Sequence, residues 1–132
     1  MWRHGYTYSG HASVAAAAMA NLDIIEREGL LERAKQLERG LADALEPLSS
    51  HALVSEVRAG TGVLAAVQVD PDAAAADPTL IGRIVPACRR SGIMTRTLAT
   101  GAIHVSPPLV LDDAGLAELA DGIASGLDEL ER

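Results

Sequence analysis

The sequence is poor in aromatic residues. Phenylalanine is absent, and tryptophan and tyrosine together make up 2% of the 132 residues. Alanine supplies much of the 48% hydrophobic content, and an alanine side chain buries little area at roughly 25 cal/mol per Å². The length is that of one domain, but its core is expected to be thin. A chain of this kind gains stability by packing against further protein.

Cysteine, lysine and long apolar runs are equally scarce. Cys88 is the one cysteine and Lys35 the one lysine; a single cysteine excludes an internal disulfide and favours the reducing cytoplasm. No apolar stretch reaches the roughly 18 residues of a membrane span. The alanine-rich run at 15–18 is too short, and the residues before it too polar, for a secretory signal. A net charge of −7 argues against nucleic acid or an anionic membrane as a partner.

The spacing of apolar residues predicts an α+β fold, in which helices cover a small, mainly antiparallel sheet. Helices are expected over 11–29, 30–46, 79–90 and 112–130. Strands are expected within 53–59, 63–70, 93–99 and 102–106, and each pair is joined by a turn that contains glycine. The second helix should turn one set of side chains inward: Leu30, Leu31, Ala34, Leu37, Leu41, Ala44 and Leu45.

Capping and turn residues set the expected boundaries of these elements. Ser9 is the predicted N-cap of the first helix, and Gly29 marks its C-cap or a kink. Residues 71–78 read as a loop because a proline stands at each end, although their alanines permit a helical turn. Pro86 is expected to bend the third helix. Asp112 should cap the last helix.

The opening stretch HGYTYSGH, residues 4–11, combines polar side chains with a helix start. Gly5 permits a close approach of the backbone. Thr7 and Ser9 offer hydroxyl groups, and amides that precede a helix are good donors to an anion such as phosphate. The alternative is a capping loop with ordinary hydrogen bonds. On the residues alone both interpretations stay open.

Arg96 is the second candidate for a binding residue. It lies in the predicted strand IMTRTLA, where alternation puts Met94, Arg96 and Leu98 on one face. The planar guanidinium suits bidentate capture of a carboxylate. The alternative is an ordinary salt bridge on the surface.

The remaining polar candidates carry weaker signals. His4 and His11 could act as general bases but are better explained as residues that orient the opening loop. His104 is expected to serve packing or to lie at the surface. Cys88 is expected to fill a half-buried apolar site; the alternative is a thiol whose pKa the flanking arginines lower. No histidine, cysteine and carboxylate cluster has the spacing of metal ligands, and 60–62 is too short for a dinucleotide-binding loop.

Residues 3–34, RHGYTYSGHASVAAAAMANLDIIEREGLLERA, resemble the hallmark stretch of class III pyridoxal-phosphate aminotransferases of the omega-amino-acid group. The segments VSEVRAGTGVLAAVQVD, residues 54–70, and GIMTRTLATGAIHVSPPLVL, residues 92–111, are similar to the family more loosely. The resemblance covers essentially the whole chain. Ala12 stands where most members have proline, which should cost little because proline is merely pre-organised at a helix start.

The resemblance implies an organisation in three segments. Residues 1–10 would end the large cofactor-binding domain of a fold-type I enzyme, 11–28 would form the interdomain helix, and 29–132 the small C-terminal domain. It also implies that Thr7 binds the phosphate of pyridoxal 5'-phosphate through its hydroxyl, with the Tyr6–Thr7 amides nearby. This loop would reach the cofactor of the neighbouring subunit in a homodimer.

The resemblance further implies a reaction. Arg96 matches the arginine that binds the substrate carboxylate, and the enzyme would move an amino group between an amine or amino acid and an α-keto acid such as pyruvate. Lys35 lies on a solvent-facing helix stripe and is unsuited to bond the cofactor. We therefore expect no catalytic residue within 1–132 and an inactive isolated chain. There are two alternatives: a non-catalytic binding module derived from this fold, and an unrelated small α+β module.

Overall fold

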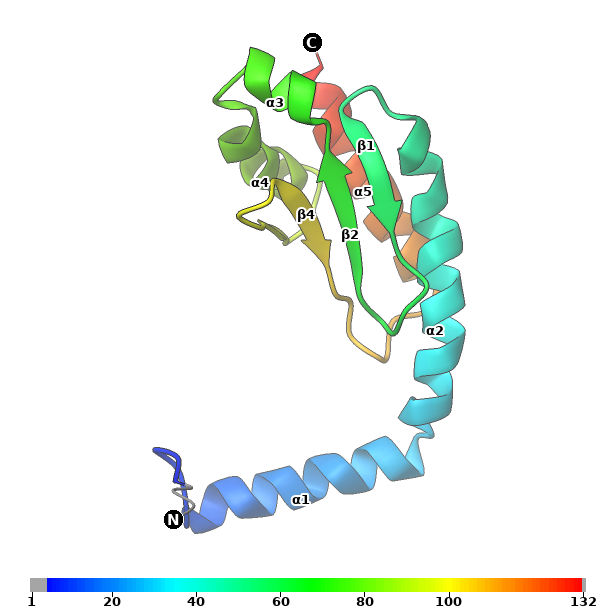
Figure 1. Ribbon diagram of the computed structural model, residues 1–132. Coiled ribbons are helices and arrows are strands. Elements are labelled where there is room, and N and C mark those ends of the chain that lie inside the picture. The colour runs from blue at the N-terminus through cyan, green and yellow to red at the C-terminus, as the bar shows by residue number, and fades with distance from the viewer. Residues whose placement is uncertain (1–4, 132) are drawn as a thin grey trace. The chain divides into compact units, whose positions relative to one another are not determined.

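The computed structural model describes residues 5–131 (Figure 1). The chain divides into two compact units, residues 1–32 and 33–132. The first carries one helix, and the second carries a four-stranded sheet with helices against it. Within residues 5–131, no helix is both long enough and apolar enough to cross a membrane.

The first unit is built on α1, Ala12–Arg27, as the spacing predicted. None of its residues is buried, and Val14, Met19 and Leu22 are all exposed. After α1 the chain passes Gly29, whose φ of +62° lies in the left-handed region that glycine adopts without strain. The predicted break at Gly29 is therefore confirmed.

The next helix, α2, spans Leu30–Leu45 and is followed by a short 3₁₀ helix, η1, over Glu46–Ser50. Leu37, Leu41 and Leu45 follow the i, i+4, i+8 spacing of one helix face and are fully buried or nearly so. The prediction that Leu31 points inward is wrong, because its side chain is 73% exposed. Leu31 lies in the first turn of α2, before the buried leucine row begins.

The sheet comprises β1 (Val54–Arg58), β2 (Ala65–Val69), β3 (Arg96–Thr97) and β4 (Ala102–Val105). Its order is β1-β2-β4-β3, and every neighbouring pair is antiparallel. The predicted hairpin β1–β2 and strand pair β3–β4 are thus confirmed. The β1–β2 turn uses Gly60 and Gly62, both with positive φ.

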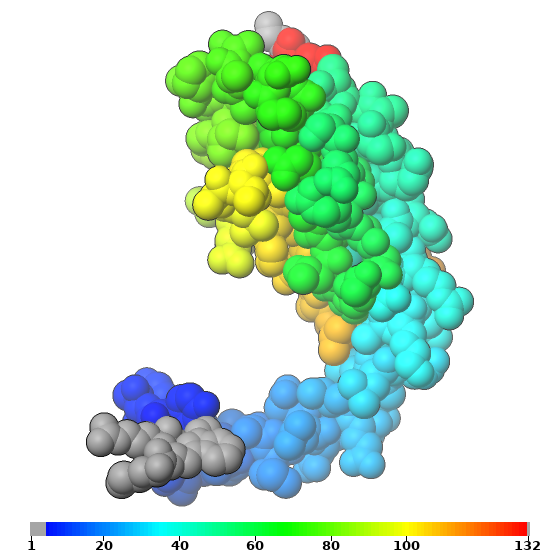
Figure 2. Space-filling model, in the orientation of Figure 1, coloured from blue at the N-terminus to red at the C-terminus, as the bar shows by residue number. Residues whose placement is uncertain are grey.

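The two faces of the sheet differ in burial. Along β2, Ala65, Val67 and Val69 are buried, whereas Ala66 and Gln68 are half-exposed. The buried face joins the leucines of α2 and the apolar residues of α4 (Leu80–Arg90) and α5 (Asp113–Leu130) in one core. In Figure 1, α5 runs behind the strands, and Figure 2, in the same orientation, shows the side of the sheet that faces away from α5. We call that side, which presents Ala66 and Gln68, the open face.

Residues Pro71–Ala76 form a short helix, α3, so the predicted loop at 71–78 is wrong. The Asp70 side chain is the N-cap and accepts hydrogen bonds from the amides of Asp72 and Ala73 at 3.0 and 2.9 Å. Pro71 occupies the first helical position, where a missing N–H costs nothing and φ is preset. The proline therefore begins a helix rather than a loop, and the alanines that follow favour it.

The helices α4 and α5 pack closely because glycine stands at their contact. A Cβ built on Gly126 of α5 would lie 2.9 Å from the backbone nitrogen of Cys88 and 3.0 Å from its Cα. The helix α4 continues through Pro86 without interruption. Asp112 caps α5 by accepting a hydrogen bond from the Gly115 amide at 2.8 Å, and this cap was predicted. The close approach therefore depends on the absence of a side chain at Gly126.

Substituting Gly126 by alanine should lower the free energy of unfolding by about 2 kcal/mol, because the added methyl meets backbone atoms that cannot move aside. Urea denaturation followed by circular dichroism measures the change. Gly82→Ala in α4 is the matched control, since a Cβ there meets no atom within 4 Å, and alanine should raise helix stability by up to about 1 kcal/mol. Equal effects of the two substitutions would contradict the close packing at Gly126.

Candidate functional site

The opening loop is folded back on itself by hydrogen bonds between Tyr6 and Ser9. The Tyr6 amide donates to Ser9 Oγ at 2.9 Å, and the Ser9 amide donates to the Tyr6 carbonyl at 3.0 Å. Ser9 is therefore not the N-cap of α1, and that prediction is wrong. His11 takes this position, and its Nδ1 accepts the Val14 amide at 3.3 Å. Because the Ser9 hydroxyl already accepts the Tyr6 amide, the capping position is taken by His11, which directly precedes the helix.

Thr7 lies at the exposed turn of this loop. Its hydroxyl makes no hydrogen bond within the part of the chain that the structure describes, residues 5–131. The Tyr6 amide, by contrast, is engaged by Ser9. The loop thus presents the Thr7 hydroxyl as a donor for an external group. The prediction for His4 lies outside the described residues.

Arg96 opens β3, a strand of two residues that is shorter than the predicted 93–99. The side chain is exposed and takes part in no ion pair or hydrogen bond among residues 5–131. The surface salt bridge that the sequence left open is therefore not formed within these residues. Its guanidinium is available to an external carboxylate.

The sheet register places Arg96 in a row of residues that crosses all four strands. Arg96 pairs with His104, His104 with Ala66, and Ala66 with Arg58. Directly paired residues of an antiparallel sheet share a face, so the row lies on the open face with Ala66. The sequence alone did not indicate that His104 stands beside Arg96.

Arg58, at the far end of this row, differs from Arg96 in its partners. Its guanidinium forms an ion pair with Glu56 and donates a hydrogen bond to Gln68 Oε1 at 3.2 Å. It is therefore committed within the sheet. Of the two arginines in the row, Arg96 is the one without a protein partner in the described part of the chain.

Cys88 lies in α4 and Lys35 in α2, outside the cross-strand row that contains Arg96. Cys88 is fully buried, and burial raises the pKa of its thiol, so the predicted half-burial is wrong, and so is the alternative of a lowered pKa. The flanking Arg89 and Arg90 are exposed, and Arg90 Nη2 pairs instead with Glu129 Oε1 at 2.5 Å. Lys35 lies on the exposed side of α2.

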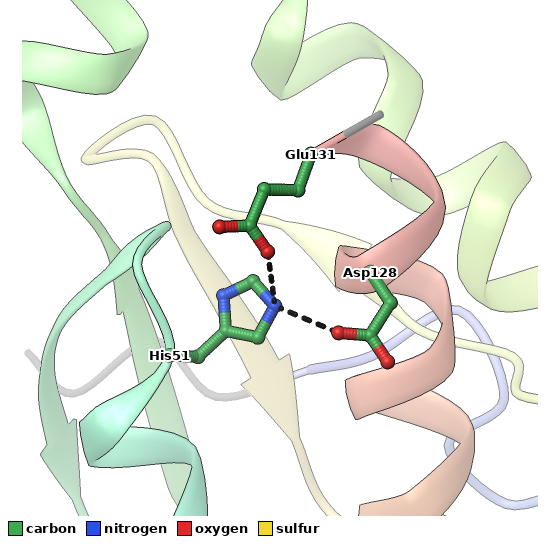
Figure 3. Close-up of side chains that lie close together, drawn as sticks. All are labelled: His51, Asp128 and Glu131. Carbon is green, nitrogen blue, oxygen red and sulfur yellow. Dashed lines mark ion pairs between the residues drawn. The ribbon is translucent and has the colours of Figure 1, made fainter.

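One polar cluster was missed by the sequence analysis because its members are far apart along the chain. His51 Nε2 lies 3.3 Å from Asp128 Oδ1 and 3.8 Å from Glu131 Oε2 (Figure 3). His51 Nδ1 accepts the Leu53 amide at 3.0 Å, so the ring proton resides on Nε2 and faces the carboxylates. A nitrogen that carries this proton does not ligate a metal. The cluster ties the end of α5 to the turn before β1.

The chain is similar to known proteins along nearly its whole length. The family model described as Aminotransferase class-III matches residues 1–127. The chain belongs to this aminotransferase family. A 4-aminobutyrate aminotransferase of Mycobacterium leprae is 35% identical over 132 residues, covering 97% of this chain and 28% of the relative. A putrescine–pyruvate aminotransferase of Pseudomonas aeruginosa is 32% identical, with 96% and 28% covered.

Solved structures agree with this assignment. An (S)-enantioselective omega-transaminase from Thermomicrobium roseum has a TM-score of 0.85 and 34% identity, covering 100% of this chain and 30% of that chain. The α+β fold expected for a class-III aminotransferase is therefore confirmed. The present chain spans less than a third of the length of the relatives that it matches.

Class-III aminotransferases depend on pyridoxal phosphate, and the opening loop can be tested for its fit to that group. The phosphate needs hydrogen-bond donors, and the exposed Thr7 hydroxyl is a donor without a competing acceptor in residues 5–131. The Tyr6 amide is already used. The Thr7 hydroxyl therefore fits a phosphate contact, and the prediction that the Tyr6–Thr7 amides lie near the phosphate stays a prediction.

Proposed function

We propose that this chain supplies binding residues to an aminotransferase that moves an amino group between an amine or amino acid and an α-keto acid such as pyruvate. The observation that carries the proposal is the match of the class-III family model to residues 1–127. Relatives that are named for putrescine and pyruvate, or for taurine and pyruvate, support a small amine and a keto acid as substrates.

Two residues carry the binding roles in this proposal. The Thr7 hydroxyl donates to a phosphate oxygen of the cofactor, and Arg96 holds the carboxylate of the keto acid or amino acid through two parallel hydrogen bonds. Bound pyridoxal phosphate supplies the electron sink that makes transfer of the amino group feasible. By fixing the carboxylate, Arg96 sets the position of the substrate carbon that exchanges the amino group.

The reactive amine of the enzyme lies outside residues 1–132 in this proposal. Such a lysine needs an environment that lowers its pKa, and Lys35 is exposed on α2. Residues 1–10 then end the large domain, 11–28 form the interdomain helix, and 29–132 form the small domain. The exposed apolar residues of α1, such as Met19 and Leu22, are covered in the complete homodimer, where Thr7 reaches the neighbouring subunit's cofactor.

The proposal predicts that residues 1–132 alone, mixed with pyridoxal phosphate, an amine and pyruvate, form no alanine above the protein-free rate. The complete enzyme under the same conditions should form alanine catalytically. Amino-acid analysis of the product measures both. Retention of cofactor absorbance by the isolated chain after dialysis would place a reactive lysine at Lys35 and contradict the proposal. An inactive complete enzyme would favour a non-catalytic binding module instead.

A further inference from the structure

The neighbour of Arg96 in the sheet suggests a second donor for the same ligand. Arg96 and His104 are directly opposed in the antiparallel pair β3–β4. Opposed residues have Cβ atoms about 4.5–5.5 Å apart and side chains on the same face. An imidazole and a guanidinium that project from such positions can both reach one small anion between or above them.

The imidazole of His104 is not engaged by the protein. It is half-exposed, and among residues 5–131 its ring nitrogens make no hydrogen bond or ion pair. Its other neighbour in the row is Ala66, which has no polar side-chain group, and Arg58 beyond it is held by Glu56 and Gln68. His104 and Arg96 are therefore the two groups of the row that can bind an external anion.

The backbone beneath His104 is held firmly, whereas the Arg96 side chain is long and exposed. Thr95 Oγ1 donates to the His104 carbonyl at 2.6 Å, and the Leu98 amide donates to the Ala102 carbonyl at 2.8 Å. The β3–β4 turn is further fixed by Gln68 Nε2, which donates to the Thr100 carbonyl at 2.9 Å. The backbone that carries His104 is thus fixed, whereas the Arg96 side chain can move.

There is also room beside His104 for the carbon atoms that accompany a carboxylate. A hollow of about 340 Å³ lies on this part of the sheet, and the residues that line it include Ala66, Leu98 and His104. Its mainly apolar lining suits the short hydrocarbon part of a keto acid, and His104 adds a polar group to that lining.

We propose that His104 is a substrate-binding residue that donates a hydrogen bond to the carboxylate held by Arg96. This inference rests on the proposed function of Arg96 and adds a third donor to its bidentate contact. Because a carboxylate has about four acceptor positions, it can receive all three hydrogen bonds at once. The ligand class is a short 2-oxo acid or the corresponding amino acid.

The test compares acceptors with and without a carboxylate in the complete enzyme. Steady-state kinetics are measured with pyruvate and with propanal, each with the same saturating primary amine as donor. In His104→Leu the KM for pyruvate should rise about tenfold, the loss expected for one hydrogen bond to a charged group. The kcat with pyruvate and both constants for propanal should change less than about twofold, because propanal has no carboxylate to accept the lost hydrogen bond.

His104→Gln is the conservative variant and should bring the pyruvate KM back to within about threefold of the unsubstituted enzyme, because its amide is again a donor. If His104→Leu does not fold, His104→Ala removes the donor without adding bulk and has the same expected result. Arg58→Ala is the control on the same row, and it should alter neither acceptor selectively.

The outcomes separate this inference from the function of Arg96. If Arg96→Ala impairs pyruvate selectively while His104→Leu or His104→Ala affects both acceptors alike, the role of His104 is wrong and that of Arg96 stands. If Arg96→Ala also affects both acceptors alike, the carboxylate site itself is wrong. Failure of glutamine to restore the pyruvate KM would likewise overturn the donor role.

Discussion

In the complete enzyme, replacement of Arg96 by alanine lowers kcat/KM for pyruvate by at least about 100-fold, because two charge-assisted hydrogen bonds to the carboxylate are lost. Each such bond contributes about 1.5–3 kcal/mol, and about 1.4 kcal/mol corresponds to a tenfold change. The Arg96 side chain is exposed and has no partner within residues 5–131. Its removal therefore leaves no unpaired protein group, and the loss reports binding of the ligand.

The measurement is the ratio of kcat/KM for pyruvate to that for an aldehyde acceptor. This ratio should fall by at least about 100-fold in Arg96→Ala, because the two hydrogen bonds to the carboxylate are lost, and it should stay unchanged in Arg58→Ala. Arg58 is the matched control because it lies on the same face and in the same cross-strand row, with its guanidinium held by Glu56 and Gln68. If the ratio falls equally in the two variants, Arg96 acts only through the positive charge that it adds to the sheet, and not by binding the carboxylate directly.

The second large effect concerns the cofactor. Replacing Thr7 by alanine should weaken the affinity of the complete enzyme for pyridoxal phosphate by up to about 100-fold, the upper range for a hydrogen bond to a charged group. The hydroxyl is exposed and donates to no other group in residues 5–131. The substitution therefore removes one donor without disturbing the Tyr6–Ser9 hydrogen bonds that shape the loop.

Cofactor loss is followed as the decrease of protein-bound absorbance during dialysis, at several concentrations of free cofactor. Thr7→Ser keeps the hydroxyl and should retain the cofactor nearly as well as the unsubstituted enzyme. Ser13→Ala removes an exposed hydroxyl from the first turn of α1 and should have no effect. Unchanged retention in Thr7→Ala would assign the phosphate to other residues.

Local patterns were sufficient to predict most of the elements. Leucines at 37, 41 and 45 repeat with the helical period, and glycines at 60, 62 and 101 supply the positive φ of the turns between strands. Asp112 is a strong N-cap by its side-chain chemistry. These features depend on neighbours in sequence, which explains why sequence reasoning found them.

The wrong predictions concern residues whose local signal had two interpretations, or residues whose surroundings are determined by a contact with a distant part of the chain. A proline after a strand can belong to a loop or begin a helix, and at Pro71 the Asp70 cap selects the helix. Ser9 is a good cap by type, but the Tyr6 amide takes its oxygen. Cys88 is buried against α5, a contact that its flanking arginines did not indicate.

The candidate site shows the same division between local and distant information. Thr7 and Arg96 were singled out from motifs, whereas the pairing of His104 with Arg96 depends on the order β1-β2-β4-β3 and on its register. Register is fixed by which side chains fill the core, here Val67 and Ile103 on the buried face. A sequence with one residue more or less in the β3–β4 turn would place a different side chain beside Arg96.

The most direct measurement is a crystal structure of the complete enzyme with pyridoxal phosphate and an unreactive carboxylate analogue of the keto acid. The account predicts Thr7 Oγ1 about 2.7 Å from a phosphate oxygen, and both terminal nitrogens of Arg96 about 2.8 Å from the carboxylate, as charge-assisted hydrogen bonds require. A phosphate bound entirely by other residues, together with an Arg96 side chain directed away from the analogue, would contradict it.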